Sequence, residues 1–236
     1  TLGFNYFSTV TKPGTEDFDV ATGTGTSYVN MVKGTLTYLE EKKIKAKKVT
    51  VIGFVAFASE RSKYGHDNTK IEFYRRAPTI AEVKTALQLR AIVVQHYGHY
   101  DFKANPARAG SGGKARPFLR RTGGHYITPI GFGLDKNGKQ SADTLISYDP
   151  AGSYQDAQHE VYTDWMRQPK SAYQNIPLLN PIGSDPARDK AFVDPNWPRY
   201  ERYGTLNQTY LMDTTLQTPK ENAKYDVMEG LIVIEV

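Results

Sequence analysis

The sequence predicts one α+β domain of 236 residues, in which helices from the N-terminal half pack on a twisted antiparallel sheet. Its 16 tyrosines, 20 glycines and 13 prolines favour strands and ordered loops over a helical bundle. Apolar residues make up 39% of the chain and charged residues 23%, as in ordinary globular proteins. A chain of this length can bury a substantial core, so we expect a single domain over residues 1–236.

Two helices are expected in the first ninety residues. The first follows the Gly/Thr run at residues 21–27, where Ser or Thr can cap its N-terminus. The second spans Thr79 to Leu89, and Thr79 and Glu82 match the capping-box pattern. In the first helix, apolar residues recur at helical spacing and predict one buried face: Val29, Val32, Leu36 and Leu39.

Strands are expected where β-branched and aromatic residues cluster. Residues 49–57 and 91–102 have this composition over strand length. Residues 125–135 and 144–149 flank Asn137 and Gly138, a pair that strongly indicates a hairpin. We therefore expect these last two strands to pair antiparallel.

The C-terminal third, residues 151–236, is rich in Pro, Asn and Tyr. We expect it to extend the same domain, with a short helix near residues 162–167 and a strand near residues 205–212. The apolar segment at residues 230–236 predicts a packed strand.

The loop of the hairpin decides whether His125 and Asp149 lie on one face of the sheet. With a strict two-residue loop, His125 would lie opposite Pro150 and Asp149 would face the other side. An odd-numbered loop or a bulge would bring both side chains to the same face, and the residues after Gly138 leave room for one.

A helix after a Gly/Thr turn, then Gly-Gly-His at residues 123–125, then Asp-Pro at residues 149–150 is an order that resembles the C39-like branch of the papain-like cysteine peptidases. The resemblance covers residues 21–152 and implies a papain-like (cysteine-proteinase-like) fold. It also implies that His125 is the general base and that Asp149 orients its imidazole, as nucleophilic catalysis requires. On their own, the two residues would favour a solvated hairpin and a turn, and the order of helix and strands around them favours the catalytic interpretation.

The nucleophile departs from this family pattern, because the chain contains no cysteine. Thr24 is the first choice for the equivalent position. Ser27 occupies it in another alignment, and an engineered Cys-to-Ala change would put Ala21 there. A glutamine upstream, which supplies an oxyanion-hole donor in relatives, is also missing from the first 27 residues. Three interpretations follow: a pseudoenzyme that binds through the old cleft, an active hydrolase that uses Thr24 or Ser27, or a peptidase inactivated by engineering.

His96, His99 and Asp101 offer two imidazoles and a carboxylate, which could supply three ligands to zinc. Their spacing is not that of a helical zinc motif, and packing of aromatic and polar side chains in a strand explains them as well. We therefore expect no metal site and no cofactor.

The expected partner is a peptide or protein, as the resemblance implies. A binding or adhesion module with a tyrosine-rich contact surface in the C-terminal third is the alternative.

The formal net charge is +5, but the lysines concentrate at residues 40–48. We interpret that segment as the solvated end of a helix, and we therefore expect no nucleic-acid binding. No apolar run approaches the roughly 20 residues of a membrane span. A start at Thr1 is compatible with signal-peptide removal and export. Together with the resemblance, it leads us to expect a secreted or surface-associated bacterial protein, and the oligomeric state is left open.

Overall fold

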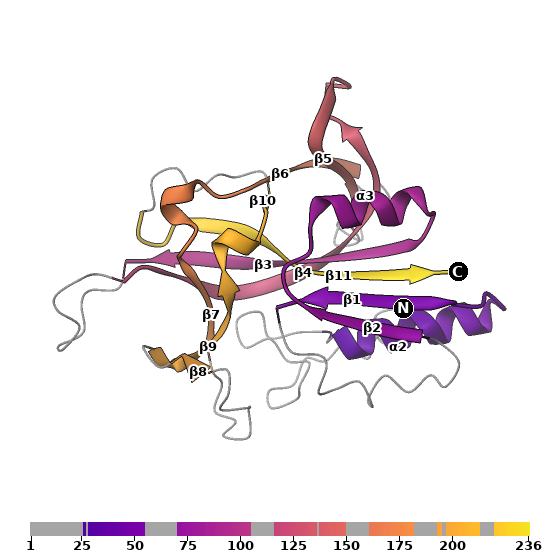
Figure 1. Ribbon diagram of the computed structural model, residues 1–236, viewed down its shortest axis with the longest axis horizontal. Coiled ribbons are helices and arrows are strands. Elements are labelled where there is room, and N and C mark those ends of the chain that lie inside the picture. Colours follow the sequence, from indigo (N-terminus) through magenta and orange to yellow (C-terminus); the bar gives the residue numbers. More distant parts are fainter. Residues whose placement is uncertain are drawn as a thin grey trace, which may run out of the picture.

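The computed structural model describes residues 26, 28–54, 70–104, 116–135, 137–149, 161–181, 193–194, 197–212 and 220–236. Over these residues the chain forms two α-helices and one eleven-stranded mixed sheet (Figure 1). The sheet is the dominant element, and the helices pack on it from two sides.

Three long strands cross the middle of the molecule: β3 (Ile92–Lys103), β4 (Phe118–Leu134) and β11 (Lys224–Glu235). β3 pairs antiparallel with the other two and lies between them. On its other side β11 pairs with β1 (Lys48–Gly53), which pairs in parallel with β2 (Lys70–Arg75). Residues 227–234 of β11 are all buried, as expected of an apolar segment inside a sheet that is covered on both faces.

Six strands close into a ring. β4 pairs with β5 (Gln140–Tyr148), β5 with β6 (Val161–Arg167), β6 with β10 (Leu211–Met212), and β10 with β11. Because β3 joins β11 to β4, the pairings run in a closed circuit. The sheet is thus curled into a small barrel, whose strands have an inner and an outer face.

One hydrophobic cluster fills the inside of this barrel. Every strand of the ring contributes to it, through Tyr97, Ile127, Leu145, Met166, Met212 and Met228. The helix α3 (Ile80–Gln88) adds Val83 and Ala86 to the same cluster, beside Val93 at the start of β3. α3 therefore packs at one end of the barrel, and the other end is formed by the later part of β3.

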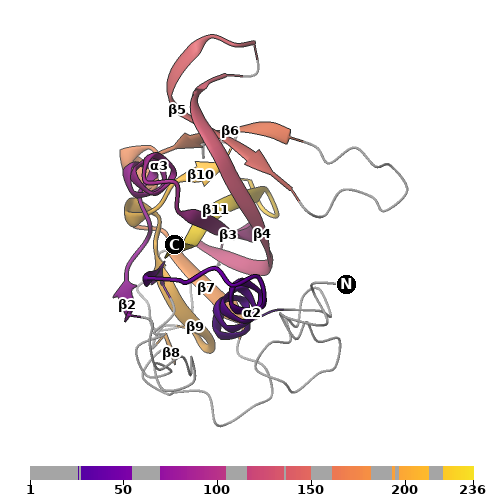
Figure 2. The same cartoon turned by 90° about the vertical axis from the view of Figure 1, so that its right-hand side faces the viewer.

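The helix α2 (Tyr28–Glu41) covers part of the outer face of the sheet. Apolar residues of α2 pack on the outer side of β1 and β11, and the predicted Val32, Leu36 and Leu39 are buried there. α2 and α3 thus lie on opposite sides of the central strands, as both views show (Figures 1 and 2). A third cluster lies around Tyr100 and Leu119, and β7 (Pro177–Pro181) and the 3-10 turns Ser171–Tyr173 and Leu206–Gln208 contribute to it. β9 (Trp197–Thr205) pairs with β7, and β8 (Val193–Asp194) pairs with β9.

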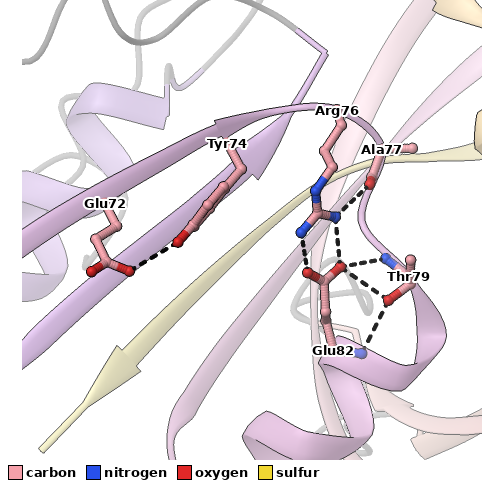
Figure 3. Close-up of polar contacts among 6 residues, drawn as sticks. All are labelled: Glu72, Tyr74, Arg76, Ala77, Thr79 and Glu82. Carbon is pink, nitrogen blue, oxygen red and sulfur yellow. Dashed lines mark hydrogen bonds and ion pairs between the residues drawn. The ribbon is translucent and has the colours of Figure 1, made fainter.

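The helix α3 begins with the capping box that the sequence predicts. Thr79 is extended and caps the helix: its side chain accepts from the Glu82 amide, while the Glu82 carboxylate accepts from the Thr79 amide (Figure 3). Arg76 adds an ion pair to the same carboxylate. The predicted capping box is confirmed.

The expected papain-like fold, with N-terminal helices on a twisted antiparallel sheet, is wrong. The described residues are mostly strand, the sheet is mixed because β1–β2 and β4–β7 are parallel, and it curls back on itself. The error lies in the long-range pairing: strands from the last third of the chain complete the barrel and supply its central strand β11.

The expected helix near residues 162–167 is also wrong, because β6 covers that segment. Pairing with β5 and β10 on its two sides fixes it as a strand, in line with the strand preference of its Val, Tyr, Thr and Trp residues. Other elements are confirmed at about their predicted places: α2, β1, α3, β3 and the β4–β5 hairpin.

Candidate functional site at the open end of the barrel

His125 and Asp149 form a close pair on the inner face of the barrel. His125 lies within β4 and Asp149 directly follows β5, and His125 Nε2 is 2.6 Å from Asp149 Oδ1. The two side chains are 25% and 23% exposed. A carboxylate at this distance fixes the orientation of the ring, so Nδ1 is the nitrogen that can exchange a proton with a ligand. The structure brings together the two residues that the sequence paired, and their catalytic role stays a prediction.

The register of the β4–β5 hairpin explains why the pair shares a face. Leu134 and Gln140 are the last paired residues before the turn, in which Gly138 has a left-handed φ of 75°. Irregularities near Gly131 and Gly133 then shift the pairing, so that Tyr148 lies opposite Thr128. One residue further, Asp149 comes beside Ile127 and so faces the same side as His125. This is the bulged alternative that the sequence left open.

A second His–Asp pair lies on the same inner face. His99 of β3 and Asp226 of β11 are direct cross-strand partners, and His99 Nδ1 is 2.6 Å from Asp226 Oδ1. Their side chains are 43% and 42% exposed. This pair was missed in the sequence, since its members are 127 residues apart and neither occurs in a recognisable motif.

Tyr97 contacts both imidazoles. Its ring meets that of His125 edge-on with centroids 5.6 Å apart, and that of His99 in the same manner at 5.1 Å. Such edge-to-face contacts are favourable and hold the rings in place. Five side chains, Asp149, His125, Tyr97, His99 and Asp226, therefore form one continuous row across β5, β4, β3 and β11.

The row lies at the end of the barrel away from α3. Along the inner face of β3, Val93 packs near α3, Gln95 is fully buried, Tyr97 is nearly so and His99 is partly open to solvent. Mouths of β-barrels are common places for ligands to bind. We call these five residues the mouth site.

Among the residues that the structure describes, two polar atoms further inside the barrel find no hydrogen-bond partner: Gln95 Oε1 and Ser147 Oγ. Both residues are fully buried, and strand alternation puts Ser147 on the same face as Leu145 and Asp149. Buried polar atoms are normally satisfied by protein or water, so the interior below the mouth site can accept polar groups.

A different set of polar residues lies on the outer face. Glu229, at the β-bulge of β11, is buried and accepts hydrogen bonds from Arg121 Nε at 3.0 and 3.2 Å. Tyr100 donates to the same carboxylate, and His96 Nδ1 lies 3.3 Å from it. Burial, and then the positive charge of Arg121, hold the pKa of His96 well below its usual range, so the ring is neutral. We call Glu229, Arg121, Tyr100 and His96 the outer cluster.

The candidate metal ligands from the sequence are not brought together. His96 belongs to the outer cluster, His99 pairs with Asp226 on the inner face, and Asp101 pairs with Arg120 at 3.0 Å. Within the described ranges, no group of three potential metal ligands is found.

The predicted nucleophile positions, Thr24, Ser27 and Ala21, lie outside the described residues. The neighbouring Thr26 is described, and its carbonyl accepts a hydrogen bond of 3.1 Å from the hydroxyl of Tyr126. Tyr126 packs against the α2 cluster on the outer face, whereas its neighbour His125 faces inward. The described end of the α2 segment is therefore held on the face opposite to His125.

The tyrosine-rich contact surface expected as an alternative for the C-terminal third stays a prediction. Tyr173, Tyr200 and Tyr210 are half-buried, and Tyr225 is buried in the third cluster. Tyr162 and Tyr203 lie outside the described side chains.

Comparisons with known proteins do not identify a family. No family model matches the chain, and searches of the curated proteins and of the solved structures found no significant similarity. Among the helices that the structure describes, neither is long and apolar enough to cross a membrane.

Proposed function

We propose that the protein is a thiol-free, peptidase-like protein that binds a peptide or protein at His125 and Asp149. The observation that carries this proposal is the 2.6 Å contact between His125 Nε2 and Asp149 Oδ1 at the mouth of the barrel. Support for the ligand class comes from the resemblance of the two strands that carry these residues to the C39-like peptidases. This support for the ligand class does not depend on the overall fold.

The pair has the chemistry that such a site requires. With one ring nitrogen bound to a carboxylate, the other can accept a proton from a neutral ligand or donate one to a carbonyl or carboxylate oxygen. Partial burial keeps the pair from being fully hydrated, so contacts made there are worth more than on an open surface. The absence of cysteine means that binding does not lead to a thioester intermediate.

Nuclear magnetic resonance of the imidazoles tests the proposal. Protein labelled with ¹⁵N-histidine is titrated with a tryptic digest of casein, and the His125 ring signals are expected to shift saturably. Asp149→Asn removes the charge that orients the ring and is expected to weaken the response. Asp143→Asn is the matched control, because this exposed carboxylate lies in β5, the strand that leads to Asp149.

Two results would contradict the proposal. The first is an unchanged His125 spectrum at saturating peptide, and the second is an equal response in the Asp149→Asn and wild-type proteins. Fluorescein-labelled casein incubated with the protein and iodoacetamide gives a separate check, since any cleavage must be insensitive to this thiol reagent.

A further inference from the structure

We propose that His99 and Asp226 form a second acid–base pair of the mouth site, and that His99 and His125 act together on one acyl group. This inference rests on the proposed function, because it takes His125 and Asp149 as the place where the peptide or protein binds. The second pair extends the proposed function from binding to a reaction, the hydrolysis of an ester or peptide bond by water. No thiol is needed for this chemistry.

The spacing of the two histidines suits one bond. His99 lies opposite Gly123 and His125 lies opposite Tyr97, so the histidines are diagonal neighbours on adjacent strands. Diagonal pairs on one face have Cα atoms roughly 7–8 Å apart, within reach of aromatic side chains. Two rings at this separation can contact the two sides of a single scissile bond.

Tyr97 packs against both imidazoles, and the position diagonal to it in the strand pairing is a glycine, Gly123. Of the four positions His99, Tyr97, His125 and Gly123, only Gly123 carries no Cβ, and it lies in line with His125 on β4. A larger residue there would stand beside both imidazoles. Gly123, which is itself buried, thus adds no side chain beside the two imidazoles.

Both imidazoles are oriented in the same way. Each has one nitrogen at 2.6 Å from an aspartate, which leaves Nδ1 of His125 and Nε2 of His99 for the ligand. The described groups that face His99 are Asp226 from β11 and Tyr97 from its own strand, and His125 faces Asp149 and Tyr97. Beyond His99 the same face continues into the charged residues Asp101, Arg120 and Lys224.

The reaction balances without a further reagent. His125 Nδ1 accepts a proton from water as the water oxygen bonds to the carbonyl carbon, giving a tetrahedral intermediate. The bond from that carbon to the leaving oxygen or nitrogen then breaks, and the leaving atom takes a proton from His99 Nε2. The carboxylic acid and the alcohol or amine depart, and solvent returns the proton from His125 to His99.

A comparison of leaving groups separates the two roles. The probes are the 4-nitrophenyl and ethyl esters of N-acetylglycine: nitrophenolate leaves without a proton, whereas ethoxide requires one. His125→Gln is expected to slow both hydrolyses, by about 100-fold or more. His99→Gln is expected to slow the ethyl ester by about 100-fold and the nitrophenyl ester by less than about tenfold, and Asp226→Asn to act in the same direction. Lys224→Gln, an exposed neighbour of Asp226 on β11, is the matched control and should change neither rate.

Other outcomes overturn the inference and show whether the proposed function survives. If His99→Gln slows both esters equally, with a native amide spectrum, His99 only supports the site. If the wild-type protein hydrolyses neither ester faster than free imidazole does, the reaction is wrong, while the casein-peptide titration still decides on binding. If His125→Gln changes nothing in either experiment, the site itself is wrong and both proposals fall.

Discussion

Gly124 faces the outer cluster at a position that leaves no room for a side chain. A Cβ there would overlap the Arg121 guanidinium and lie 2.7 Å from His96 Nε2. Neither neighbour can retreat easily, because Arg121 is bonded to the buried Glu229 and His96 stacks on Tyr126 with ring centroids 4.5 Å apart. The two glycines before His125 therefore lie on different faces of the sheet: Gly123 faces the mouth site, and Gly124 leaves space for the side chains of the outer cluster.

Gly124→Ala is expected to lower the free energy of unfolding by about 1–3 kcal/mol, the usual cost of overpacking a filled site. Urea unfolding followed by tryptophan fluorescence measures it. Gly131→Ala in the same strand is the control, because its added Cβ would meet Ile146 only at an ordinary contact distance of 3.5 Å. Equal stability of the two variants would show that the outer cluster can rearrange.

His96 makes the stability of the protein depend on pH. Its pKa is well below 6.5 in the folded protein, because of burial and then Arg121, whereas in the unfolded chain it is near 6.5. Below that pH the unfolded chain binds a proton that the folded protein does not, so the free energy of unfolding falls as the pH falls. In His96→Gln this part of the decline between pH 7 and 5.5 is expected to disappear, as measured by urea unfolding at each pH. An unchanged slope would mean that His96 is protonated in the folded state.

Residues of the mouth site differ in how far a sequence can find them. His125 and Asp149 were identified because glycines and a proline surround them within one hairpin. His99 and Asp226 are joined only by the pairing of β3 with β11, and no local pattern indicates that register. Alternation in the segments around both residues predicts strands and no more, so the second pair required the tertiary structure.

Local signals were sufficient for the elements whose ends carry their own contacts. Thr79 and Glu82 specify where α3 begins, and Asp135 accepts hydrogen bonds from the Asn137 and Lys139 amides in the turn of the hairpin. Segment 161–167 has no such signal at its ends, and its neighbours in the sheet determine its structure. Elements of this kind are assigned from sequence only when the topology is already known.

Thr79→Ala tests how much the capping box contributes to the element. Loss of the cap is expected to cost about 1 kcal/mol of unfolding free energy, and Thr79→Ser should restore most of it because the hydroxyl returns. Thermal and urea unfolding measure both variants. If alanine and serine are equally stable, the ion pair between Arg76 and Glu82 holds the helix start on its own.

Glu82 adds an acid-dependent component to the same cap. Burial by itself would raise the pKa of this carboxyl, but hydrogen bonds from Arg76 and Thr79 outweigh it and lower the pKa below 4.5. The stabilisation is therefore complete above the pKa of the unfolded chain and is lost as the pH falls through the lower pKa of the folded protein. Glu82→Gln should abolish this decline below pH 4.5, which unfolding measurements at low pH would detect.

At the scale of the whole molecule, β11 joins the three hydrophobic clusters. Ile232 packs with α2 on the outer face, Leu231 packs with α3 inside the barrel, and Val227 belongs to the third cluster. The C-terminal strand is thus the centre of the fold and not an addition to it. Composition could not reveal this, because it does not indicate which strands an apolar segment will separate.

Ile232→Ala is expected to destabilise the entire molecule, by about 2–5 kcal/mol for a fully packed isoleucine. Because β11 pairs with β1, β3 and β10, the loss should spread beyond the α2 side that Ile232 contacts. Amide hydrogen exchange should therefore accelerate by similar factors in α2 and in α3, which faces the opposite side of the strand. Val236→Ala is the control, since Val236 is partly exposed at the end of the chain and should leave both helices unchanged. Faster exchange confined to α2 would instead mean that the two faces of β11 unfold as independent units, with the mouth site belonging only to the barrel.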